Sequence, residues 1–380
     1  MKEISESQAA ALVEDWAAIM GYLPAGWQER AVGMGALRRA RGFSSAEALL
    51  RTLLIHLAQG CSLRETAVRA RAGRLAEVSD VAIWKRLQAS EEWLRWMALE
   101  LASGYRTGAV PDGRGRLRLR VVDATTVSEP GSTGSDWRLH YALEMKTLRC
   151  DFFELTDVHG GESYTRVPVR AGDLMMGDRG YESVEGVSHV VRHQGEVLVR
   201  MKAIGLPLKG PGGGKLDLLK RLRDLGVGEV GEWKVQMASA DNGEIAGRVC
   251  AVRRSQTAAA LAEKRLRARC SRSGCKPQAA ALEATQYVSV FTTVRPALLR
   301  ALEVLELYRG RWQIETCFKR LKSVVGLGHL PKYDDRSCRA WLYGKLLVAL
   351  LAEHLLNEAR HFSPWGYPLR LAEGVPARLS

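Results

Sequence analysis

Three acidic residues occur where the sequence could bring them together around a metal ion. Asp123 lies near the end of the first strongly apolar strand pattern, Asp178 follows a later short apolar segment, and Glu315 lies within an otherwise basic helical segment. Carboxylates at strand ends can converge at one edge of a sheet, and a helix beside that edge can add a third. Hard divalent cations such as Mg²⁺ prefer oxygen ligands of this kind. Two such ions, about 3.5–4 Å apart, could activate a nucleophile and stabilise the leaving oxygen in phosphodiester chemistry.

Four side chains fall on one face of the helix predicted around Glu315. At about 100° per residue, Tyr308, Arg311 and Lys322 lie at about +20°, −40° and −20° from that glutamate. A tyrosine, two cations and a carboxylate make a poor core-facing stripe and a suitable surface for phosphate groups. An ordinary solvated face with an ion pair between Arg311 and Glu315 explains the same spacing. On spacing alone both interpretations stay open.

Each aspartate also has a purely structural interpretation. Asp178 stands in the segment GDRGY (177–181), which could be a strand-ending turn with glycine at positive φ. Asp123 could cap the turn after its strand. The three acids therefore point to an active site as a set, and none of them does so alone.

The elements that would position these residues follow from a change in residue period along the chain. Residues 1–105 are predicted to be mostly helical, with helices near 45–58, 62–71 and 80–88 that begin at Ser or Ser-Asp capping patterns. Alternating and apolar runs then predict strands. These predicted strands are 116–127, 137–145, 151–158, 161–169 (an edge strand, because of Pro168), 174–181, 196–201 and 287–294. A helix is predicted at 183–193, and two long helices near 295–323 and 335–360.

Composition divides the chain into segments. A linker rich in Gly, Pro and Arg occupies 106–116, and a glycine-rich break occurs at 210–214. We expect an α/β fold, with a mixed sheet flanked by helices, a helical N-terminal domain and a β-rich inserted subdomain. The predicted boundaries are 1–105 for the N-terminal domain, 106–201 and 286–362 for the two parts of the sheet domain, 202–285 for the insertion and 363–380 for a tail.

The predicted N-terminal helices carry much positive charge. Eight arginines stand between Arg38 and Arg74, against Glu47 and Glu65. Short capped helices with basic faces favour a DNA-binding unit resembling a helix-turn-helix. A plain helical bundle with solvated arginines fits the same pattern.

The run YRGRWQIETCFKRLK (308–322) has the spacing Tyr-x2-Arg-x3-Glu-x6-Lys. It resembles the signature of bacterial transposases of the insertion-sequence-four family. Members of that family have an RNase-H-like domain with an Asp-Asp-Glu triad, and their second Asp commonly stands in a motif similar to Asp-Arg-Gly-Tyr, here 178–181. Their first Asp commonly stands as Asp-x-Thr/Ser, here Asp123-Ala124-Thr125. The resemblance covers roughly residues 40–360.

The resemblance implies roles for individual residues. Asp123, Asp178 and Glu315 would be the catalytic residues and would hold two Mg²⁺ or Mn²⁺ ions. Cationic and aromatic residues around them would contact DNA, namely Tyr308, Arg311, Lys322, Lys319, Arg179 and Tyr181. The reaction would cut DNA at the transposon ends and join the exposed 3′-OH to target DNA, without a protein nucleophile.

The inserted segment is where the resemblance is weakest. Some relatives stack a flipped-out base on a Trp of their insertion, and Trp233 is the one Trp in 202–285. A Trp in a short strand is more often a core residue. Both interpretations of Trp233 stay open, and with them the hairpin route of cleavage.

Charge and composition agree with a DNA substrate. The 380 residues contain 56 Lys and Arg against 42 Asp and Glu, a net charge of +14, which favours a polyanionic partner. Scattered cysteines and the lack of a long apolar run predict a cytoplasmic protein without a membrane span, and the resemblance implies that it is nucleoid-associated. A homodimer on DNA is expected, since relatives bring two ends together. Three rivals remain: an RNase-H-like nuclease that cuts without joining, a silent DNA-binding regulator, and a basic scaffold protein.

Overall fold

The computed structural model describes residues 16–38, 42–104, 117–128, 131, 136–202, 205–240, 242–328, 330–331 and 334–359. The predicted tail at 363–380 and the whole of the predicted linker at 106–116 lie outside the described residues. The chain forms two compact units. One unit comprises 1–105, 128–133 and 320–380, and the other comprises 106–127 and 134–319.

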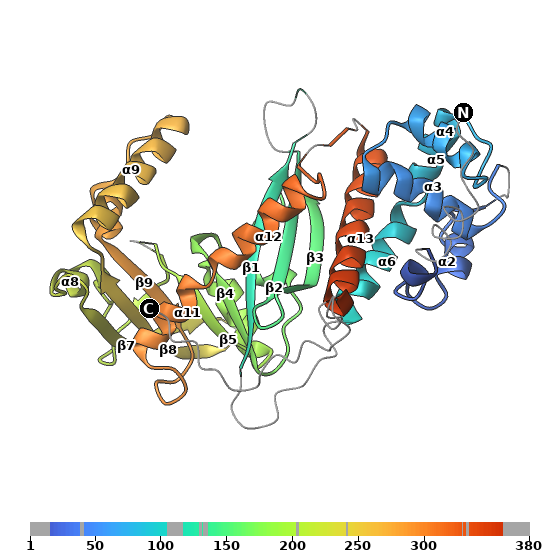
Figure 1. Cartoon of the computed structure of the whole chain (residues 1–380). Coiled ribbons are helices and arrows are strands. Elements are labelled where there is room, and N and C mark those ends of the chain that lie inside the picture. The colour runs from blue at the N-terminus through green and yellow to red at the C-terminus, as the bar shows by residue number, and fades with distance from the viewer. Residues whose placement is uncertain are drawn as a thin grey trace, which may run out of the picture. The chain divides into compact units, whose positions relative to one another are not determined.

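The first unit is helical (Figure 1). Its helices are α2 (Trp27–Gly33), α3 (Ala46–Gln59), α4 (Leu63–Ala72), α5 (Asp80–Ala89), α6 (Glu91–Gly104) and α13 (Asp335–Ala359). The side chains of Ser45, Ser62 and Ser79 accept hydrogen bonds from backbone N–H groups three residues later, at 3.1–3.2 Å. These contacts satisfy orphan donors of the first turn. The three capped helices therefore begin where the sequence predicts.

Helix α13 packs against α3, α5 and α6. Arg339 on α13 pairs with Glu91 at the start of α6 at 2.6 Å, and Gln88 donates to Asp334 at 2.8 Å. An apolar stripe on α13 includes Leu342, Leu346 and Leu350, which are almost fully buried. The last long helix thus belongs to the same compact unit as the N-terminal helices, although the sequence suggested grouping it with the sheet domain.

The second unit is built on one mixed sheet of nine strands in the order β3-β2-β1-β4-β5-β9-β8-β7-β6. The strands are β1 (Arg118–Val127), β2 (Trp137–Glu144), β3 (Arg149–Asp157), β4 (Asp173–Gly177), β5 (Glu196–Arg200), β6 (Leu208–Lys209), β7 (Val230–Ser239), β8 (Gly243–Arg253) and β9 (Tyr287–Thr292). Strands β3, β2 and β1 pair antiparallel, and β1, β4 and β5 pair parallel. This arrangement confirms the predicted RNase-H-like α/β class.

The inserted segment extends this sheet. Strand β9 pairs with β5 on one side and with β8 on the other, so β8, β7 and β6 continue the row of strands. The helices of the second unit are α7 (Val184–Arg192), α8 (Leu218–Arg223), α9 (Gln256–Arg272), α10 (Ala279–Glu283), α11 (Ala301–Arg309) and α12 (Trp312–Ser323), whose last turn passes into the first unit. Helix α11 contacts β7 and β8, and α12 crosses the sheet at β1 and β2, as Figure 1 shows.

A buried ion-pair network fixes the start of β1 against β4. Arg120 is 1% exposed and binds Asp151 at 2.7 Å and Asp173 at 3.0 Å. Arg118 binds Asp173 through two nitrogens, at 2.7 and 2.9 Å. Such pairs are stable only when both charges are neutralised and hydrogen-bonded. The network therefore holds the parallel register in which Val121 lies beside Met176.

Two predicted elements are wrong. Residues 161–169 form no edge strand, because Ser163 caps a 3₁₀ turn at Tyr164–Arg166 and Tyr164 is fully buried. The helix predicted for 295–323 is two helices separated by a turn at 310–311. A Cβ at Gly310 would approach the carbonyl oxygen of Leu307 and the Cε of Met145 to 3.1 and 3.2 Å, so the glycine allows close packing at this break.

Candidate active site

Asp123 lies in β1, two residues after Val121, the last residue of β1 that pairs with β4. Continuing that register would place it beside Asp178, the residue after β4. Its Oδ1 accepts the N–H of Ala124 at 2.8 Å, and its side chain is 16% exposed. Burial raises the pKa of the Asp123 carboxyl to about 7, against the Ala124 hydrogen bond, and the negative charge of Asp178 adds to the rise.

Asp178 is held by the turn that follows β4. Its Oδ1 accepts the N–H of Gly180 at 2.7 Å, which caps the 3₁₀ turn at Arg179–Tyr181. A Cβ at position 180 would lie 3.0 Å from that oxygen and 2.0 Å from Oε2 of Glu162. The glycine of the GDRGY segment is therefore required because two carboxylates approach its Cα.

Glu315 lies on α12, one turn after Arg311, which stands in the break between α11 and α12. The guanidinium of Arg311 forks between two acids: Nη1 binds Oδ2 of Asp123 at 3.2 Å, and Nη2 binds Oε1 of Glu315. Arg311 is largely buried, and Glu315 is half exposed. The fork brings a strand carboxylate and a helix carboxylate to one cation.

The three predicted acids thus lie at one place without forming a single coordination shell. No group of three His, Cys, Asp or Glu side chains within the described ranges is close enough to hold a metal ion. The donor set nevertheless suits a hard cation, because two of the carboxylates already converge on a positive group and the third raises the pKa of one of them. Gathering all three around one ion would require Arg311 to leave Asp123 and Glu315.

The predicted DNA contacts are placed unequally. Lys319 is exposed on α12, and Lys322, in its last turn, is partly buried, which lowers its pKa. Tyr308 is buried, and its hydroxyl is hydrogen-bonded to Arg200. Because of the break at 310–311, Tyr308 and Glu315 belong to different helices. The prediction that they share one face of a single helix is therefore wrong.

The two residues after Asp178 support the fold of the turn. Arg179 donates from Nε to the carbonyl oxygen of Met201 at 3.1 Å. Tyr181 is 1% exposed and packs on Tyr164, with ring centroids 5.1 Å apart. Trp233 packs against the sheet core, with its ring over Gly231.

Glu162 is a site residue that the sequence analysis missed. Its Oε2 and Asp178 Oδ1 flank the same point above Gly180, so the two oxygens are at most about 5 Å apart, a distance at which like charges interact. Burial and the charge of Asp178 raise the pKa of the Glu162 carboxyl. The residue stands in a loop with no local pattern, and only the fold of β3, the loop and β4 brings it to Asp178.

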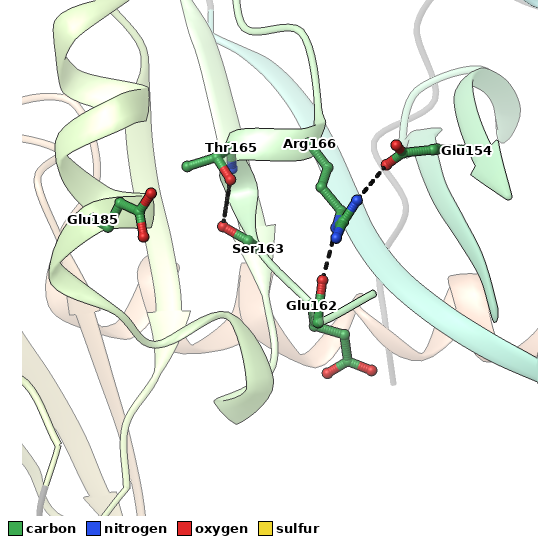
Figure 2. Close-up of a pocket in the computed structure, with 7 residues that line it drawn as sticks. Glu154, Glu162, Ser163, Thr165, Arg166 and Glu185 are labelled. Carbon is green, nitrogen blue, oxygen red and sulfur yellow. Dashed lines mark hydrogen bonds and ion pairs between the residues drawn. The ribbon is translucent and has the colours of Figure 1, made fainter. Parts of the chain in front are cut away.

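A pocket opens beside the loop of Glu162 (Figure 2). Glu154, Glu162 and Glu185 line it together with Ser163, Thr165 and Arg166. Arg166 binds Glu154 at 3.1 Å and the carbonyl oxygen of Gly161 at 2.8 Å, which fixes the backbone just before Glu162. The loop beside this pocket thus supplies Glu162, a fourth carboxylate near Asp178.

The chain is similar to known transposases. Residues 156–351, over half of the chain, match the family described as a transposase DDE domain. The putative transposase InsL for insertion sequence element IS186A of Escherichia coli strain K12 is 32% identical over 359 residues, which cover 92% of this chain and 96% of that protein. The transposase for insertion sequence element IS421 of Escherichia coli is 32% identical over 360 residues, with the same coverage.

A solved structure is also similar, that of the piggyBac transposase synaptic complex with hairpin DNA. It has a TM-score of 0.45 and 9% identity, and the match covers 90% of this chain and 72% of that one. The family match and the insertion-sequence relatives together decide the assignment. The chain belongs to the DDE transposases of bacterial insertion sequences.

Proposed function

We propose that this transposase cuts DNA at the ends of its insertion sequence and joins the exposed 3′-OH to target DNA, with Asp123, Asp178 and Glu315 as the catalytic carboxylates. The observation that carries the proposal is the Arg311 fork, which joins Asp123 on a central strand to Glu315 on a helix. The Tyr-x2-Arg-x3-Glu-x6-Lys spacing of 308–322 supports assignment to the insertion-sequence-four family.

The three carboxylates would hold two Mg²⁺ or Mn²⁺ ions. Glu162 would add a further negative charge beside Asp178. Bound divalent ions would supply activation of the attacking hydroxyl and neutralisation of charge on the phosphate. The protein's own part is positioning. The ion-pair network on β1 and β4 sets the register of the two aspartates, and α12 sets the glutamate.

The cations around the carboxylates would bind the DNA backbone. Lys319 and Lys322 on α12 and Arg179 in the turn after Asp178 would neutralise phosphates on either side of the reacting group. Arg311 would exchange its two carboxylates for a phosphate when the ions bind. Tyr308 and Tyr181, both buried, would hold the cations and the turn in place.

The helical N-terminal segment, 1–105, would recognise the end sequence, because its capped helices carry exposed arginines such as Arg64 and Arg71. Two copies would act together as a homodimer on DNA, since two ends must be joined to one target. Acting on bacterial DNA would place the protein in the cytoplasm, at the nucleoid. No helix among the described residues is both long and apolar enough to cross a membrane.

The test uses a labelled duplex carrying the element's end, a supercoiled target plasmid and Mg²⁺. The proposal predicts a cut strand and a joined product in which the label is covalently attached to plasmid DNA. Cutting without joined product would instead indicate a nuclease, and binding without cutting would indicate a regulator. Omitting Mg²⁺ should abolish both products, whereas a basic scaffold would bind regardless of metal.

A further inference from the structure

Three arginines gather at the end of the sheet where β9 begins. Arg200 ends β5 and lies beside Val290 of β9, and Arg254 follows β8, whose Arg253 lies beside Tyr287 of β9. The backbone N–H of Arg254 donates to the Gln286 carbonyl at 2.8 Å, and its Nη1 donates to the Thr285 carbonyl at 3.3 Å. Arg179 joins them through its bond to Met201, the residue after Arg200.

Helix α9 brings two more arginines to this place. Arg265 and Arg269 are one turn apart, so they share a face of the helix. The positive charge of Arg265 acts on Arg254, and that of Arg269 acts on Arg179. The group, here called the arginine cluster, consists of Arg179, Arg200, Arg254, Arg265 and Arg269.

The arginine cluster is poorly neutralised within the described residues, where the charge of Glu182 acts on Arg179. Within the described part of the chain, none of its five members forms an ion pair with Asp or Glu. The Nε of Arg200 is buried without a hydrogen-bond partner. Burial and the neighbouring arginines lower the pKa of Arg254 to about 10. Gathering like charges costs free energy, so the cluster is better explained by an anion that binds there than by folding.

Helix α9 is largely exposed to solvent. It runs for 17 residues with no buried side chain, begins at a Ser255 cap and contains five Lys or Arg against one Glu. Figure 1 shows it projecting beyond the strands β7, β8 and β9. A helix with so little apolar burial gains little stability from packing, and its charge suits a phosphate backbone.

The arginine cluster is linked to the active site. Arg179 directly follows Asp178, and Arg200 is hydrogen-bonded to Tyr308 of the 308–322 motif. Guanidinium groups match phosphate oxygens with two parallel hydrogen bonds. A strand whose reacting phosphate lies at Asp178 would therefore meet several arginines a few nucleotides further on.

We propose that the arginine cluster is a binding site for the DNA phosphate backbone, which guides the strand from Asp178 along helix α9. The proposal rests on the proposed function only for the identity of the strand. It assigns to the inserted segment a role in holding DNA through charge, independent of base stacking on Trp233.

The test compares two double variants that remove the same charge from the same helix. Arg265→Gln/Arg269→Gln removes the two cations that helix α9 adds to the cluster. Lys264→Gln/Arg267→Gln removes two cations outside that face, which lie about 100° and 160° around the helix from Arg265. All four side chains are exposed, so neither variant disturbs a core. The probe is a fluorescein-labelled duplex of random sequence without divalent metal, titrated between 50 and 200 mM salt.

The cluster variant should bind about tenfold more weakly or worse at low salt, and its slope of log K against log salt should fall by nearly 2, since each lost phosphate contact removes about 0.9. The control variant should change the slope by less than half as much. Equal effects from both variants, or no effect from the cluster variant, would overturn the proposal.

A parallel cleavage assay separates this inference from the proposed function. If wild-type protein cuts end DNA while both double variants bind as it does, the cluster proposal fails and the function stands. If the cluster variant loses affinity while wild-type protein never cuts, the phosphate site stands and the proposed reaction fails.

Discussion

Arg311 lies between Asp123 and Glu315 and forms an ion pair with each. A divalent ion that binds the same oxygens must compete with the guanidinium, because both seek the same negative charge. Replacing Arg311 by Gln removes the competitor and should raise the affinity of DNA-free protein for Mn²⁺ several-fold, measured by isothermal titration calorimetry. Arg309→Gln, an exposed charge on the preceding helix, is the matched control. Unchanged or weaker Mn²⁺ binding by the Arg311 variant would contradict this role.

The interactions of individual residues could be predicted where a local sequence pattern determines them. The ion pair between Arg311 and Glu315 follows from their spacing of four and survives the break in the helix, because Arg311 stands in the turn just before α12. Tyr308 was expected to face phosphate. Its side chain is instead buried, just before the turn at Gly310, and is hydrogen-bonded to Arg200. Glu162 could not be predicted, since its approach to Asp178 depends on contacts between distant segments.

At the scale of elements, the network on β1, β3 and β4 decides where the aspartates lie. Asp173 is 1% exposed and accepts hydrogen bonds from both Arg118 and Arg120. Asp173→Asn would leave Arg118 and Arg120 with Asp151 as their one carboxylate partner in the network, so the free energy of unfolding should fall by about 3–5 kcal/mol. Urea unfolding measures the change.

The control for this loss is Glu263→Gln, which breaks an exposed pair with Arg267 and should cost less than about 1 kcal/mol. If the Asp173 variant were as stable as the Glu263 variant, the buried network would not hold the sheet together.

His140 on β2 gives the sheet a pH-dependent stability. Burial, with the charges of Arg166 and Arg138, lowers the pKa of His140 to about 4. Between pH 6.5 and 4 the unfolded chain binds a proton at His140 that the folded chain does not. The free energy of unfolding therefore falls as pH falls, by on the order of 3 kcal/mol. Urea unfolding at pH 7 and pH 4.5 should show a steeper loss for wild type than for His140→Gln. Parallel losses would exclude the effect.

Element types were largely predictable because strands and helices follow residue period. Strands β1, β2, β3 and β9 and the serine-capped helices lie within a few residues of their predicted ranges. The segment 161–169 alternates like a strand, yet Ser163 and the burial of Tyr164 turn it into a 3₁₀ turn. The pairing of β8 with β9, which merges the insertion into one sheet, is a long-range choice that no local pattern encodes.

For the whole molecule, the net charge is +14. The arginine cluster forms no ion pair within the described residues, whereas Arg51, Arg64 and Arg69 of the N-terminal helices are paired with Glu47, Asp80 and Glu65. Composition alone predicted a polyanionic partner, and it could not say which surfaces would meet it. We propose a division in which the carboxylates act on one phosphate while the surrounding cations hold the others.

The most direct test of the account is Mg²⁺-dependent cleavage of labelled end DNA by wild type, Asp178→Asn and Glu315→Gln. Each amide keeps the shape of its carboxylate and removes its charge, so cleavage should fall by about three orders of magnitude or more. Binding of the same duplex without metal and the circular dichroism spectrum should stay as in wild type. Cleavage by either variant at the wild-type rate would contradict the central claim that these carboxylates form the active site.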